Sequence, residues 1–224
     1  LMFETSIGKI FSFFKQHSYF IKMLIHQERK YLIQITCEFP CFYNIFCWTL
    51  ADIHTKGIIL RALDQFRLKS CIDFKPRDAE EYYLSIQKCF SSIGRVNPNG
   101  QVLSIGEGCE YVHTVEHEML HALGFYHEQS RYDRDDYVTI VTDNILKGKE
   151  HNFNKVASDT STTHGTPYDY MSVMHYSNDA FTNGNGSTII TIDPTFQNVI
   201  GQKLEMSYYD VQELNLLYKC SKYT

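Results

Sequence analysis

One stretch of the sequence, residues 117–127, constrains this chain more than any other; it reads His-Glu-Met-Leu-His-Ala-Leu-Gly-Phe-Tyr-His. Residues four apart lie on one face of a helix, so His117 and His121 can present their imidazoles to the same metal ion. Gly124 permits the positive φ that ends a helix, and the chain can then turn to bring in His127 as a third ligand. Three imidazoles and one open position are typical of a catalytic zinc site, because a structural site is closed by a fourth ligand.

Two further features support a catalytic metal site. Glu118 follows the first histidine and can reach a water held by the same metal, where it can act as a general base. The extended motif is typical of metzincin peptidases, which carry a methionine-containing turn further along the chain. Residues 172–176 read Ser-Val-Met-His-Tyr and supply such a turn with Met174. A chance match of the five fixed positions is expected in on the order of one in ten thousand chains of this length.

The composition is that of an ordinary globular chain. Of its 224 residues, 43% are hydrophobic and 21% are charged, and the length suits one domain with or without an extension. The net charge of −5 gives no electrostatic case for a nucleic acid or an anionic membrane. No run approaches the roughly 18 apolar residues that a membrane-spanning helix needs. We therefore expect no nucleic-acid partner and no membrane span.

The seven cysteines indicate an oxidising compartment. None of them forms a CxxC pair, and their wide spacing fits disulfides better than a metal or redox site. The odd number leaves at least one cysteine without an assigned partner. Asn185-Gly186-Ser187 is a glycosylation sequon in a loop rich in glycine and asparagine, which adds weak support for secretion.

From about Thr55 onward the apolar residues are regularly spaced. Their spacing predicts early strands followed by later helices, which is an α+β class. The zinc helix is expected to have Thr114 as its N-cap, and the last helix to begin with a capping box of Ser207 and Asp210. The other expected elements are a helix ending before Cys71, strands around Ile72 and Phe74, around Leu84 and Ile86, and from Val102 to Ile105, and a last helix running to Cys220.

Residues 1–50 show no clean period of 2 or 3.6. They hold three cysteines, and we interpret them as an unassigned, diverged or aberrant N-terminal segment that packs poorly; these cysteines are Cys37, Cys41 and Cys47. Residues 51–224 are then the catalytic domain.

From the Cys71 region onward the chain resembles an astacin-family zinc metallopeptidase. The residues that carry the resemblance are Lys69-Ser70-Cys71-Ile72-Asp73-Phe74, Gly94-Arg95-Val96, Gln101-Val102-Leu103-Ser104, the zinc motif with its Glu-Gln-x-Arg-x-Asp-Arg-Asp tail, Tyr168-Asp169-Tyr170, and Leu217-Tyr218-Lys219-Cys220. The resemblance implies a metzincin-type catalytic domain of two subdomains. The N-terminal one holds a mixed sheet and the zinc helix, and the loop-rich C-terminal one ends in a helix. The family's mature amino terminus and first strand have no convincing match in residues 1–50.

The resemblance also implies roles for particular residues. His117, His121 and His127 bind one zinc ion, and Glu118 is the general base. Tyr176 is a switchable tyrosine that binds the zinc or the oxyanion, Met174 lies beneath the metal as a hydrophobic floor, and Glu128 is a buried structural carboxylate near the mature amino terminus. The implied disulfides join Cys71 to Cys220 and Cys89 to Cys109. The strand with Gln101, Val102, Leu103 and Ser104 is the implied cleft edge, on which a substrate peptide adds as an extra strand.

The predicted function is that of a secreted zinc-dependent endopeptidase, a hydrolase acting on proteins or peptides. Its water nucleophile is activated by the metal, with Glu118 as base. An alternative is a catalytically silent secreted binding protein on the same fold, and a weaker one is another type of metal hydrolase. The presence of Glu118 and Tyr176 favours the enzyme, because binding alone needs no general base.

Overall fold

The computed structural model describes residues 24–25, 31–36, 53–76, 84–86, 90–94, 96, 101–104 and 109–220. The chain divides into two compact units, Leu1–Ala122 and Leu123–Thr224. A sheet and two helices make up the first, and loops with a final helix the second, so the predicted α+β class is confirmed.

The sheet of the first unit has six strands, most of them short. Its path runs β1-β2-β4-β6-β5, with β3 paired to β2 as well. Neighbours pair in parallel except for β1 with β2 and β5 with β6, which are antiparallel, so the predicted mixed sheet is confirmed. The strands are β1 (Leu24–Ile25), β2 (Tyr31–Thr36), β3 (Ile72–Pro76), β4 (Leu84–Ile86), β5 (Phe90–Ser91) and β6 (Gln101–Ser104).

Strand β2 lies in the segment where the sequence showed no convincing match to the family's first strand. It pairs in parallel with β3 through Tyr31 to Ile35 and with β4 through Ile35 and Thr36. The strand is a short run that reads Tyr-Leu-Ile-Gln-Ile-Thr. Periodicity alone does not identify a short run of largely apolar and β-branched residues as a strand. The cysteines of this segment lie outside the described residues.

The edge of the described sheet also differs from the prediction. Strand β6 pairs with β4 on one side and β5 on the other, through Leu103 to Ser91 and Ser104 to Phe90. Strand β5 is therefore the terminal strand among the described residues, and the assignment of residues 101–104 as the cleft edge is wrong. A free edge needs unpaired backbone groups, and β6 has its groups engaged where β5 lies beside it.

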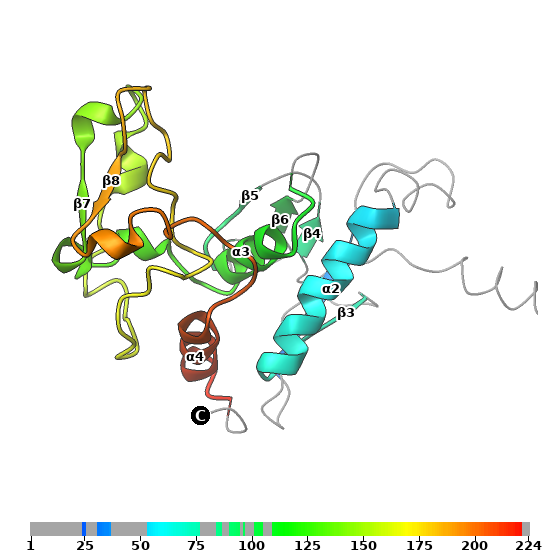
Figure 1. Ribbon diagram of the computed structural model, residues 1–224. Helices are drawn as coiled ribbons and strands as arrows, with labels where there is room; N and C mark the ends of the chain where they lie inside the picture. The colour runs from blue at the N-terminus through cyan, green and yellow to red at the C-terminus, as the bar shows by residue number, and fades with distance from the viewer. Residues whose placement is uncertain are drawn as a thin grey trace, which may run out of the picture. The chain divides into compact units, whose positions relative to one another are not determined.

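Helix α2 (Ile53–Lys69) packs against β3, as Figure 1 shows. Its buried face carries Ala62, Leu63 and Phe66, and the Phe66 ring meets Phe74 of β3 edge to face at 5.2 Å. The helix ends before Cys71, as predicted. Ser70 closes it, because its hydroxyl donates to the Phe66 carbonyl and accepts from the backbone N–H of Ile72.

Helix α3 (Val112–Ala122) carries the first half of the zinc motif and packs on α2. Its face toward the core is fully buried at Val115, Met119 and Leu120. The helix begins two residues before the predicted N-cap. The carbonyl of Tyr111 already accepts from the N–H groups of Thr114 and Val115, so Thr114 lies in the first turn.

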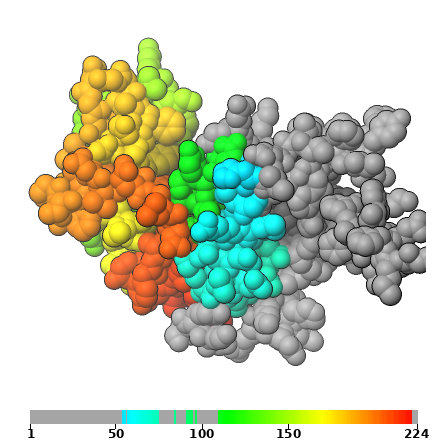
Figure 2. Space-filling view, turned by 45° about the vertical axis from the view of Figure 1, so that its right-hand side comes forward, coloured from blue at the N-terminus to red at the C-terminus, as the bar shows by residue number. Residues whose placement is uncertain are grey.

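The second unit is loop-rich, as predicted, and a two-stranded antiparallel sheet lies in its core. Strands β7 (Val138–Ile140) and β8 (Ile189–Thr191) pair antiparallel. The segment from about residue 170 to 200 forms much of this unit's surface in Figure 2, in yellow to orange. The core residues are Val138, Ile145, Phe153, Tyr168, Ile189 and Ile200. Five short 3-10 helices are described: η1 (Glu128–Ser130), η2 (Arg134–Asp136), η3 (Thr142–Asn144), η4 (Glu150–Phe153) and η5 (Pro194–Phe196).

Helix α4 (Tyr208–Leu217) ends the described chain, with a turn leading to Cys220. The predicted capping box is confirmed, since Ser207 accepts from the N–H of Asp210 and Asp210 accepts from the N–H of Ser207. Tyr218 then donates to the Leu123 carbonyl at 2.9 Å, which ties the helix end to the start of this unit. Among the described residues, none of the helices combines the length and apolar character that a membrane crossing requires.

Candidate metal centre and peptidase site

The three histidines of the motif lie together. One ring nitrogen from each of His117, His121 and His127 is within 4.8 Å of the other two. His117 and His121 share a face of α3, with ring centroids 4.6 Å apart. Gly124 has φ +103°, a conformation that side chains rarely adopt, and this turn leads the chain to His127. Nitrogens bound to one tetrahedral zinc ion lie about 3.4 Å apart, so the cluster fits such an ion after small side-chain rotations.

Glu118 is half-buried on α3, directly after the first histidine. The structure thus places Glu118 on the same helix as His117 and His121, and its role as a general base stays a prediction. The end of the helix is fixed from the sheet side, because Gly94 donates its backbone N–H to the His121 carbonyl at 2.8 Å. His121 is itself buried, which restricts its ring rotation.

The methionine turn is held in place by a buried carboxylate from α4. Asp210 accepts from the Ser172 hydroxyl at 2.6 Å and from the Val173 N–H at 2.8 Å. The Ser172 hydroxyl also accepts from the N–H of Met174 at 2.9 Å. Burial raises the pKa of Asp210, although these donors and the Ser207 N–H lower it. The capping carboxylate of α4 thus also shapes the turn that carries Met174.

Two hydrogen bonds join this turn to the segment after the third histidine. The Glu128 N–H donates to the Met174 carbonyl at 3.2 Å, and the Tyr176 N–H donates to the Gln129 side-chain oxygen at 3.0 Å. Gln129 is fully buried. Its backbone carbonyl accepts from Arg134, which also donates to the Phe153 carbonyl. Tyr176 is therefore fixed relative to His127 through backbone and buried amide contacts.

The Tyr176 ring lies among aromatic neighbours. Its centroid is 4.4 Å from that of His127, 5.8 Å from Phe153 and 5.6 Å from Phe181. The next residue, Ser177, lies against the backbone of Gly201. A Cβ atom at position 201 would overlap Ser177. These contacts place the tyrosine ring beside the third histidine of the cluster.

His175, between Met174 and Tyr176, is a neutral, structural imidazole. It is fully buried, and burial lowers its pKa to about 4. Its Nδ1 is 2.7 Å from the Tyr176 carbonyl, which can only accept, so Nδ1 carries the proton. Nε2 then accepts from the Tyr168 hydroxyl at 2.8 Å. This chain of contacts links the turn to the aromatic core.

Glu128 is a buried carboxylate, as predicted. It accepts from Arg131 at 3.1 Å and from the Asp169 N–H at 2.8 Å. Burial raises its pKa to about 8, although Arg131 lowers it. The predicted neighbour, the amino terminus, lies outside the described residues.

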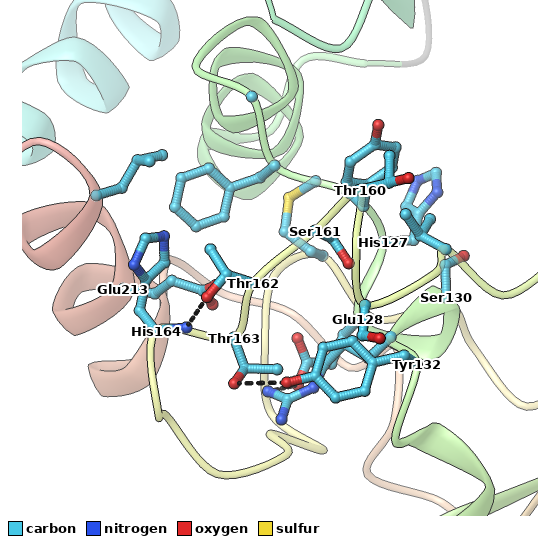
Figure 3. A pocket seen from close by; sticks show the side chains of 18 of the residues that line it. His127, Glu128, Ser130, Tyr132, Thr160, Ser161, Thr162, Thr163, His164 and Glu213 are labelled. Carbon is cyan, nitrogen blue, oxygen red and sulfur yellow. Dashed lines mark hydrogen bonds and ion pairs between the residues drawn. The ribbon is translucent and has the colours of Figure 1, made fainter.

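A cavity of about 480 Å³ opens beside Glu128 within the second unit. Figure 3 shows Glu128 and Glu213 around it together with the serine and threonine side chains of residues 160–163. Two hydrogen bonds hold the segment of residues 160–163 in place. One runs from the His164 N–H to Thr162, and the other joins Tyr132 and Thr163. Glu213, from α4, has its pKa raised to about 7, chiefly by burial. The cavity is thus lined by two carboxyl groups of raised pKa and by Arg131, next to the third histidine.

The cysteines agree with one predicted pair. Cys71, Cys109 and Cys220 are all disulfide-bonded, and Cys71 is joined to Cys220. The predicted partner of Cys109 is Cys89, which lies outside the described residues, so that pairing stays a prediction.

The site and fold match a known peptidase family. A sequence model of the astacin peptidase family matches residues 41–219. The chain belongs to the astacin family. The structure is similar to that of high choriolytic enzyme 1, a hatching enzyme zinc-protease from medaka (Oryzias latipes). That match has a TM-score of 0.78 at 34% identity and covers 88% of this chain and 94% of the other.

Astacin-family relatives extend the match at the sequence level. Meprin A subunit beta from Rattus norvegicus is 55% identical over 173 residues, which cover 76% of this chain. The zinc metalloproteinase nas-6 from Caenorhabditis elegans is 39% identical over 166 residues, 73% of this chain and 48% of its own length. The chain spans about a quarter of the length of the meprin subunit. The zinc in the names of nas-6 and the hatching enzyme agrees with the three-histidine cluster.

Sequence reasoning missed two residues of this astacin site. Gln129 appeared only as part of the tail after the zinc motif, and Asp210 only as a helix cap. Gln129 bonds to Tyr176, 47 residues away, and Asp210 bonds to Val173, 37 residues away. No local sequence pattern predicts contacts over such separations.

Proposed function

We propose that this chain is a secreted zinc-dependent endopeptidase that hydrolyses peptide bonds of proteins. The observation that carries the proposal is the cluster of His117, His121 and His127. Glu118 lies on α3 together with the first two histidines. Family membership supports it, because the astacin relatives are named zinc proteases. The disulfide of Cys71 with Cys220 supports secretion, since such bonds persist in oxidising compartments.

Each residue has one task in this proposal. The three histidines hold zinc, which when bound supplies a Lewis acid for the scissile carbonyl and lowers the pKa of water. Glu118 takes a proton from the attacking water and returns it to the leaving amine. The Tyr176 hydroxyl donates a hydrogen bond to the oxyanion of the tetrahedral intermediate. Met174 is buried and serves as an apolar floor beneath the histidines.

The test is digestion of casein by the recombinant secreted protein, with and without a zinc chelator. We expect cleavage that the chelator abolishes and added zinc restores. The Glu118→Gln variant is the matched control, because it keeps all three histidines. It should bind about one zinc ion per chain and lose nearly all activity. Folded, zinc-loaded protein that leaves casein and other unfolded substrates intact would support the silent binding protein instead. Activity of Glu118→Gln within tenfold of the parent would refute the general-base role.

A further inference from the structure

A surface loop before β8 contains two consecutive Asn-Gly pairs with different surroundings, residues 183–184 and 185–186. The loop is tied to the preceding η3 segment at both ends. The Asn183 N–H donates to the Asn144 carbonyl at 2.8 Å, and the Asn144 side chain donates to the Ser187 carbonyl at 2.8 Å. Thr182 also closes the loop across its base, donating to the Gly186 carbonyl at 2.7 Å. The loop is therefore an ordered projection of the second unit.

The first asparagine is a structural residue. The Asn183 side-chain nitrogen donates to the Asp143 carbonyl at 2.9 Å, and its oxygen accepts from the Asn185 N–H at 3.0 Å. Both ends of this carboxamide are therefore engaged in holding the loop. A group attached to the Asn183 nitrogen would take one of its two N–H positions and crowd the contact with Asp143.

The second asparagine, Asn185, has a carboxamide that does not hold the loop and that lies in a sequon. Asn185 is exposed, and within the described part of the chain its carboxamide makes no hydrogen bond. Asn185-Gly186-Ser187 is also the only Asn-x-Ser/Thr sequon in the 224 residues. Gly186 has φ +129°, so the backbone turns between the asparagine and the serine. In Figure 2 the segment that leads into β8 lies at the surface of its unit.

We propose that Asn185 is an N-glycosylation site, and that the structure accommodates the glycan without change. In the transfer, the Asn185 side-chain nitrogen bonds to the anomeric carbon of a lipid-diphosphate-linked oligosaccharide. The nitrogen loses one proton, and the lipid diphosphate leaves. The glycan projects into solvent from a loop whose own hydrogen bonds use Asn183 and backbone groups. This inference rests on the proposed secretion of the chain.

The test uses protein secreted from cultured animal cells behind a cleavable signal peptide. Ser187 allows a matched pair of variants, because its backbone carbonyl holds Asn144 and its hydroxyl makes no hydrogen bond among the described residues. Ser187→Ala removes the sequon, and Ser187→Thr keeps it. We expect glycan-removing amidase to increase the mobility of the parent and of Ser187→Thr, and to leave Ser187→Ala unchanged. In ¹⁸O water the enzyme should convert Asn185, and not Asn183, into labelled aspartate.

Casein digestion by the same media separates this inference from the proposed function. Secreted, active parent protein with unmodified Asn185 would overturn the glycosylation site and leave the peptidase proposal intact. Glycosylated but inactive protein would do the reverse. Glycosylation at Asn185 that abolished secretion or thermal stability, both restored in Ser187→Ala, would refute the claim that the loop accommodates the glycan.

Discussion

The side-chain oxygen of Gln129 accepts a hydrogen bond from the Tyr176 backbone N–H at 3.0 Å. The two residues are 47 positions apart, and Gln129 is fully buried two residues after the third histidine. This contact sets the distance between the metal ligand and the tyrosine that we propose to act on the oxyanion. A 3-10 turn, η1, holds Gln129, and the carboxylate of Asp210 holds the turn before Tyr176.

Gln129 is therefore predicted to be a positioning residue. Gln129→Met keeps the side-chain volume but leaves the Tyr176 N–H without an acceptor, which costs about 1–3 kcal/mol of stability. We expect kcat to fall by about tenfold or more, because about 1.4 kcal/mol of lost transition-state stabilisation corresponds to a factor of ten. KM and bound zinc should change little. Gln129→Glu keeps an acceptor oxygen and should recover part of kcat. A Met variant that is less stable but has unchanged kcat would show a purely structural role.

Tyr176→Phe tests the hydroxyl alone. The ring contacts with His127, Phe153 and Phe181 remain, so folding and zinc content should be unchanged. Loss of one oxyanion donor lowers kcat by about 10²–10³ in other hydrolases, and we expect a fall of that order. KM should rise much less, because the hydroxyl acts chiefly in the transition state. Steady-state kinetics on a fluorogenic peptide measure both. An increase in KM with unchanged kcat would make Tyr176 a ground-state binder.

The disulfide of Cys71 with Cys220 closes a long loop. Chain entropy predicts that a loop of well over a hundred residues gains up to about 4–5 kcal/mol from such a bond. Replacing both cysteines with serine, which leaves no free thiol at either position, should lower the urea midpoint accordingly. Peptide mapping of the unreduced parent should recover these two cysteines in one linked pair of peptides. A variant as stable as the parent would show that the closed loop contributes nothing.

Glu213 predicts a pH dependence of stability. Its pKa is raised from 4.5 to about 7, chiefly by burial, so between these values the folded chain holds a proton that the unfolded chain has released. Stability should therefore fall as the pH rises from about 4.5 to 7 and stay low above that range. The difference in pKa corresponds to about 3 kcal/mol as an upper bound.

The matched variant is Glu213→Gln, which keeps the shape and removes the ionisable group. It should be more stable than the parent at pH 8 and nearly equal to it at pH 4.5. Urea unfolding at both pH values measures the difference. A constant offset between the two proteins across this range would contradict the assignment to Glu213.

The sequence by itself determined the features that depend on local spacing. Helical periodicity places His117 and His121 on one face, and Gly124 permits the turn to His127, so the metal ligands followed from residues 117–127 alone. The capping box of Ser207 and Asp210 is equally local, with its two partners three residues apart. Strands β3 and β4 followed from short alternating runs. In each case the physical signal lies within a few residues.

Tertiary structure decided what depends on distant partners. Strand β6 is not an edge strand because β5 pairs beside it. Strand β2 belongs to the sheet because it pairs with β3 and β4. The sequence showed neither pairing, because hydrogen bonds between strands leave no trace in the spacing of either strand. Gln129 and Asp210 act through bonds to residues 47 and 37 positions away. A buried polar side chain takes its role from the group that satisfies it, and only the folded chain brings that group within reach.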